Sequence, residues 1–120
     1  MPLQGRYLYA ANMDTDAAHA DLLGEVYDTE HIPAILKVPG VISVARFEKQ
    51  PLTMMLGGEK RTIVVDDEPV FSALYELESA DVLMSDEWAA ATEVGRWADM
   101  VRPYTTNRRP ILRRRVYPAD

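Results

Sequence analysis

The segment Tyr27 to Pro33 carries the residue types that proton transfer needs, namely a phenol, a carboxylate and an imidazole within five positions. With about 100° of rotation per helical residue, Tyr27 and His31 form an i, i+4 pair along one edge of a helix, and Glu30 falls in its apolar stripe. An imidazole ionises near neutral pH and acts as a general acid or base when a neighbour orients it and water is excluded. His31, Tyr27 and Glu30 are therefore the predicted catalytic residues.

His31 also has a structural interpretation, because a lone histidine beside a tyrosine near a helix end is often only a polar contact within the fold. Arg46 is open to two interpretations as well. It sits on a mostly apolar strand face, where a buried cation needs a partner. We expect it either to bind substrate by orienting an anionic or carbonyl group, or to pair with Glu48, Glu76 or Glu30.

Trp88 and Trp97 lie nine residues apart, on opposite sides of Gly95. Large aromatic side chains of this kind anchor cores and interfaces. They also form the walls of pockets that bind aromatic ligands. Both residues are predicted to line a substrate pocket if one exists.

The chemistry of metals and cofactors finds little support in the sequence. The chain has no cysteine, and its two histidines are twelve residues apart, so a metal site would depend on carboxylates from elsewhere. No phosphate-binding glycine loop, nucleophile elbow or dinucleotide fingerprint is present. We predict a protein without a metal and without a cofactor.

The elements that must position these residues follow the order β-α-β-β-α-β. Periods of 2 and 3.6 alternate along the chain. They predict strands over 5–12, 41–49, 70–78 and 109–117, a helix over 16–30 with a last turn at 34–37, and a second helical region from Ser85 to Val101. Pro33 predicts a kink near His31 because it lacks an amide hydrogen. Residues 51–69 read as an irregular insertion or arm, and the whole chain, 1–120, as one domain.

The second and third predicted strands are apolar on both faces. Strands of this kind need cover on both sides. One layer of helices covers one face, and a second copy of the chain is the most economical cover for the other. The sequence therefore predicts a homodimer, with a monomer whose segment 51–68 folds over the sheet as the alternative.

Composition narrows the remaining function classes. Thirteen Lys and Arg against nineteen Asp and Glu give a net charge of −6, which disfavours nucleic acid and anionic membranes as partners. No apolar run has the length of a signal segment or a membrane span. Without cysteine there is no sign of an oxidising compartment, so a cytoplasmic location is expected.

Three segments together resemble a known superfamily: Tyr27-Asp28-Thr29-Glu30-His31-Ile32-Pro33, Val38-Pro39-Gly40-Val41 and Ala73-Leu74-Tyr75-Glu76-Leu77-Glu78-Ser79. They are similar to the dimeric α+β-barrel proteins, especially the EthD-like members, over about residues 5–50 and 70–117. The resemblance implies an α+β, ferredoxin-like fold with an antiparallel sheet. It also implies two subunits packed sheet to sheet and a cavity between each sheet and its helices. His31 matches the histidine that follows an acid near the end of the first helix in EthD-like proteins.

The related families include cofactor-free oxygenases, dehydratases, isomerases and haem-degrading monooxygenases. The resemblance therefore implies a cofactor-independent enzyme that acts on a small cyclic or aromatic, polyketide-like carbonyl compound by proton transfer or oxygenation. A non-catalytic dimeric module that binds a small hydrophobic molecule is the alternative. A haem-dependent monooxygenase is a further alternative, although the haem-binding histidine arrangement of those relatives finds no convincing match here.

Overall fold

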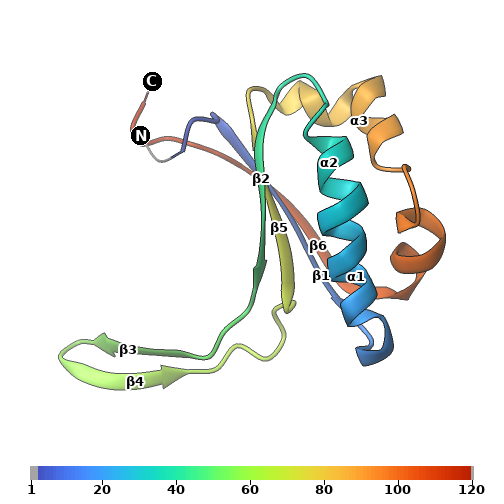
Figure 1. The fold of residues 1–120 in the computed structure, drawn as a ribbon. Coiled ribbons are helices and arrows are strands. Elements are labelled where there is room, and N and C mark those ends of the chain that lie inside the picture. Colours follow the sequence, from blue (N-terminus) through green and yellow to red (C-terminus); the bar gives the residue numbers. More distant parts are fainter. Residues whose placement is uncertain (1–2, 120) are drawn as a thin grey trace.

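The computed structural model describes residues 3–119 and has the predicted α+β, ferredoxin-like fold. Four antiparallel strands form one sheet in the order β2-β5-β1-β6, and all helices lie on one face of it (Figure 1). The strands are β1 (Tyr7–Thr15), β2 (Val41–Glu48), β5 (Phe71–Leu77) and β6 (Thr105–Arg114). The predicted order of elements is therefore correct.

The first helical stretch runs through Pro33 without the predicted kink (Figure 1). It comprises η1 (Ala17–His19), α1 (Ala20–Val26), η2 (Tyr27–His31) and α2 (Ile32–Ile35). The segment η2 is a π-turn, in which the N–H of Ile32 bonds to the carbonyl of Tyr27. A π-turn takes one extra residue into the helix. The missing amide of Pro33 is thus accommodated by a change in winding rather than by a break.

The second helical stretch is built from short pieces, as the capping residues predict. They are η3 (Ala80–Met84), α3 (Asp86–Ala91), η4 (Trp97–Val101) and η5 (Arg102–Tyr104). Ser85 Oγ accepts a hydrogen bond from the N–H of Trp88 at 3.1 Å, which caps the start of α3. Gly95 lies in the turn between α3 and η4 and has a φ of +71°, a conformation that favours glycine.

The boundaries of the first and last strands differ from the prediction at both ends. The first strand extends to Thr15 instead of ending near Asn12, and the last strand begins at Thr105 rather than near Arg109. The pairing of β1 with β6 continues past a bulge between Asn12 and Asp14. A bulge interrupts the two-residue alternation that a strand prediction depends on, and this hid the ends of both strands.

The core fills the space between the sheet and the helices. Its side chains come from every layer of the fold: Met13, Leu23, Val26, Tyr27, Ile35, Val38, Ala73, Tyr75, Leu77, Val82, Ala91, Trp97 and Val101. Alternate residues of β5, from Ala73 to Leu77, point into this core. The opposite face of the sheet carries no helix (Figure 1).

Residues 51–69, which the sequence predicts as an irregular insertion or arm, contain a β-hairpin formed by β3 (Leu52–Leu56) and β4 (Glu59–Ile63). Its turn is Gly57-Gly58, where both residues have positive φ, as a two-residue hairpin turn requires. The hairpin projects from the face of the sheet that has no helices (Figure 1). The radius of gyration is accordingly 16.0 Å, against about 13.6 Å for a compact domain of this length. No helix among residues 3–119 is long and apolar enough to cross a membrane.

Candidate functional site

A cavity of about 270 Å³ lies between the helices and the sheet, at the low end of the size range for small-molecule sites. Aromatic, basic and small apolar side chains line it: Tyr9, Ala11, Met13, Tyr27, His31, Tyr75, Trp88, Thr92, Trp97, Arg102 and Arg108. No carboxylate belongs to this lining. Of the residues predicted from the sequence, it contains His31, Tyr27, Trp88 and Trp97.

His31 is buried, with 5% of its surface exposed, and its Nδ1 has no hydrogen-bond partner. The pKa of His31 is lowered to about 4, chiefly by burial and further by the nearby charge of Arg102, while Glu93 opposes this shift. The imidazole is therefore neutral at physiological pH and is able to accept a proton. An unpaired buried nitrogen is costly and uncommon, which points to a partner that completes the site.

Two groups of three rings form the walls of the cavity. In the first, His31 lies 5.0 Å from Tyr27 and 4.9 Å from Trp97 between ring centroids. In the second, Tyr9 lies 5.3 Å from Tyr75 and 5.9 Å from Trp88. Rings at these separations attract one another and hold the walls in place.

A hydrogen bond between the phenols of Tyr27 and Tyr75 joins the two groups. Burial raises the pKa of Tyr27 to about 12, although this bond with Tyr75 opposes the shift. Burial, followed by the charge of Tyr27 and the hydrogen bond with it, also raises the pKa of Tyr75. Both phenols thus stay protonated at neutral pH and each carries an O–H that can donate.

Glu30 does not lie in the cavity, contrary to the expectation that it falls in the apolar stripe. Its carboxylate accepts hydrogen bonds from the backbone N–H of Arg96 at 2.8 Å and from Arg96 Nε at 2.6 Å. The uniform helical rotation used for the prediction fails at the π-turn, whose wider winding brings His31 into the core and leaves Glu30 at the edge.

Arg46 is also absent from the cavity lining. Its Nε and Nη2 donate to the two carboxylate oxygens of Asp28 at 2.8 and 3.0 Å. This pairing fits the structural interpretation of Arg46, but the acid is Asp28 and none of Glu48, Glu76 or Glu30. The helical wheel points Asp28 away from the apolar stripe, toward the side on which β2 passes.

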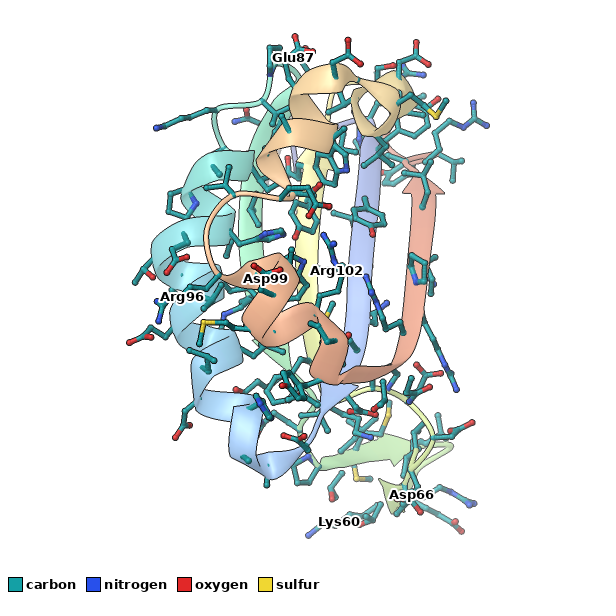
Figure 2. All side chains as sticks on the ribbon, turned by 90° about the vertical axis from the view of Figure 1, so that its right-hand side faces the viewer. Lys60, Asp66, Glu87, Arg96, Asp99 and Arg102 are labelled. Carbon is teal, nitrogen blue, oxygen red and sulfur yellow. The ribbon has the colours of Figure 1, made fainter. Side chains whose placement is uncertain are left out.

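The sequence did not single out the other lining residues, among them Tyr9, Tyr75, Arg102 and Arg108. Strand alternation places Tyr75 on the apolar face of its strand but gives no reason to pair it with Tyr27. Arg108 belongs to a basic C-terminal run in which nothing marks one arginine from another. Figure 2 shows Arg102 in front of the sheet, whereas Arg96 lies on the flank beside the first helical stretch.

A larger hollow of about 670 Å³ lies where the hairpin leaves the sheet. Its lining includes Phe47, Leu52, Ile63 and Val65, and contains no histidine, tyrosine or arginine. Its lining also includes Glu48, Lys49, Asp66 and Glu68, but its surface is mostly apolar and of the kind that a protein partner covers.

The comparisons with known proteins support the fold only. No family model matches this chain, and no curated protein matches it significantly. Among solved structures, it is similar to the haem-degrading protein MhuD from Mycobacterium tuberculosis, in a structure with two haems bound in its active site. The TM-score is 0.55 at 12% identity, and the match covers 95% of this chain and 99% of that one. At this identity the likeness establishes the shared α+β fold.

Proposed function

We propose that this chain is an EthD-like, cofactor-independent enzyme that moves a proton on a small aromatic or cyclic carbonyl compound, with His31 as the base. The observation that carries the proposal is a neutral, buried imidazole with an unpaired Nδ1 in a wall of aromatic rings. A base of this kind needs its substrate held close, and the buried rings of Tyr27 and Trp97 beside His31 provide a wall for this.

Tyr27 has the complementary role. Its hydroxyl is protonated at neutral pH and lines the same cavity, so it can donate a hydrogen bond to the carbonyl oxygen of a substrate. Negative charge develops on that oxygen when His31 removes a proton from the neighbouring carbon. A donor fixed in advance stabilises this charge. His31 then returns the proton to another atom of the same compound, so the reaction is an isomerisation.

The experiment that tests this function follows deuterium exchange into 2-tetralone and phenylpyruvate in D₂O by proton NMR. We expect the wild-type protein to accelerate exchange at the carbon beside the carbonyl. His31→Ala should reduce that acceleration by about 10²-fold or more, as the loss of a general base does. Circular dichroism of the variant checks that it is folded, and runs under air and under nitrogen show whether oxygen is consumed.

The alternative is a non-catalytic module that holds a small aromatic molecule in the same cavity. It predicts that both compounds bind, as seen by fluorescence of Trp88 and Trp97, while their exchange rates equal those in buffer. That result would reject the catalytic proposal and leave the binding function.

Haem fits this cavity poorly. The volume of about 270 Å³ suits one small ring system, and a macrocycle as large as haem would have to displace the walls. The rings of Tyr27 and Trp97 pack within 5.0 Å of the ring of the one lining histidine and leave little room beside it for a macrocycle. A haem titration followed by visible absorbance provides the test, and a stable new haem spectrum that depends on His31 would favour the haem-dependent alternative.

We further propose that the chain forms a homodimer through the face of the sheet without helices. One row across the four strands on that face is entirely apolar, and consists of Ala45, Leu74, Ala10 and Ile111. The hairpin adds exposed Leu52, Met54 and Leu56 beside it. An isolated two-stranded hairpin is marginally stable in water, so this one needs a surface to pack on. A second copy offers an apolar face of the same kind and allows a closed twofold arrangement.

A further inference from the structure

We infer that the ligand of the cavity is a small aromatic compound with an anionic oxygen group, most simply a carboxylate, and that Arg108 binds this group. The inference rests on the proposed function in one respect, since it names the substrate class of the same site. It depends on the charges around the cavity, which the mechanism above does not use.

Arg108 is held at the cavity by a local distortion of β6. The preceding residue, Asn107, has a φ of +49°, next to the bulge in the pairing of β1 with β6. Its side chain donates to Asp14 Oδ2 at 3.1 Å and to the carbonyl of Asp67 at 3.0 Å. Bulges redirect side chains near functional sites, and asparagine tolerates this conformation better than most residues. Arg108 consequently lies on the helix-covered side of the strand, where it lines the cavity.

Arg108 has no ion-pair or hydrogen-bond partner among residues 3–119, whereas several other arginines of the fold are paired. Arg46 pairs with Asp28, Arg96 with Glu30, and Arg109 with Glu68: the structure gives each of these cations a carboxylate. The lining around Arg108 contains no acidic residue that could play this part. An arginine at the mouth of a polar and aromatic cavity, without an internal counter-ion, is suited to an external anion.

Arg102 contributes positive charge but is already bound. Its guanidinium donates to both carboxylate oxygens of Glu93, at 3.1 and 2.8 Å, and to the carbonyl of Thr92 at 3.3 Å. It therefore fixes the wall beside His31 and leaves Arg108 as the free cation of the site.

An anionic ligand would also improve the base. The charge of Arg102 contributes to the low pKa of His31. A carboxylate bound near the imidazole would act in the opposite direction and raise that pKa toward neutral. Binding of the right substrate would thus make His31 a stronger base, whereas an uncharged compound would not.

The rest of the cavity selects an aromatic body. The rings of His31, Tyr27 and Trp97 form one wall and those of Tyr9, Tyr75 and Trp88 the other. Flat rings bind such walls by stacking or by edge contacts. A volume of about 270 Å³ limits the body to one or two fused rings.

The test compares binding of 2-naphthoate and 2-naphthamide, which have the same rings and differ in charge. The chain has two tryptophans, Trp88 and Trp97, and both line the cavity, so their fluorescence reports occupancy directly. We expect 2-naphthoate to bind at least tenfold more tightly than the amide. Arg108→Gln should weaken naphthoate binding roughly ten- to hundredfold, as loss of a charge-assisted hydrogen bond does, and should leave the amide unaffected.

Two further variants serve as controls. Arg108→Lys keeps the charge without the planar fork and should retain part of the preference for naphthoate. Arg114→Gln removes an arginine from the same strand outside this cavity and should bind both compounds as the wild type does. Equal affinity for the two compounds, no binding of naphthoate, or unchanged binding by Arg108→Gln would each overturn the inference. These measurements involve no turnover, so they separate a failure of the charge assignment from a failure of His31 catalysis.

Discussion

The carboxylate of Glu30 accepts hydrogen bonds from both the backbone and the side chain of Arg96. These bonds join the first helical stretch to the loop that precedes η4. The N–H of Arg96 donates to Glu30 Oε1 at 2.8 Å, and Nε donates to Oε2 at 2.6 Å. The contact holds the element that carries His31 against the one that carries Trp97. Glu30 is thus a positioning residue at the outer edge of the site.

The contact between Glu30 and Arg96 needs a residue without a side chain at position 95, and substitution of Gly95 tests this. A side chain at Gly95 would meet the Glu30 carboxylate, and its φ of +71° disfavours any residue with a Cβ. We expect Gly95→Ala to lower the free energy of unfolding by more than about 1 kcal/mol, measured by urea denaturation. Gly58→Ala, in an open turn that also has positive φ, controls for the backbone conformation alone. An equal loss of unfolding free energy in both variants would show that the contact between Glu30 and Arg96 does not depend on the absence of a side chain at position 95.

The low pKa of His31 predicts how stability depends on pH. In the unfolded chain the imidazole gains a proton near pH 6.5, but in the folded protein only near pH 4. Between these values the unfolded state binds more protons, so stability falls as the pH is lowered. We expect His31 to account for a loss of about 3 kcal/mol between pH 7 and pH 4, measured by urea denaturation.

His31→Phe is the matched variant, because it keeps a ring in the wall and cannot ionise. Its stability should decline less over the same range. Arg102 and Glu93 both act on His31 and remain charged through most of the range, so their charges are common to the two proteins. If the free energy of unfolding changed with pH equally in the wild type and in His31→Phe, His31 would not be a buried neutral imidazole.

The hairpin and the apolar row predict how the proposed dimer can be broken. Leu74→Arg places a charge in the centre of the row, and Met54→Glu places one on the hairpin face that Leu52 shares. Each should raise the dissociation constant of the dimer at least about tenfold, because buried apolar anchors dominate such interfaces. Sedimentation velocity or light scattering measures the change.

Met55→Glu is the control, since Met55 points to the other face of the hairpin and is already 63% exposed. It should leave the dimer intact. A wild-type protein that is monomeric at micromolar concentration would contradict the proposal. Equal effects of Met54→Glu and Met55→Glu on the dissociation constant of the dimer would contradict it as well.

The sequence by itself determined the element order, the fold class and most of the aromatic site. Periodicity alone distinguishes strands from helices, and the i, i+4 spacing of Tyr27 and His31 was enough to bring them together. The apolar positions on both faces of β2 and β5 likewise anticipated a sheet with one face left uncovered by helices.

Tertiary structure decided which charged groups belong to the cavity. A helical wheel assumes one rotation per residue, and the π-turn at Tyr27–His31 breaks that assumption, moving Glu30 to Arg96 and His31 inward. Which arginine meets which acid depends on contacts between residues far apart in the chain and on a bulge at Asn107, and neither leaves a local pattern. The sequence thus brought Tyr27 and His31 together on one helix, whereas the winding of that helix and the side chains that surround its histidine were decided in the folded structure.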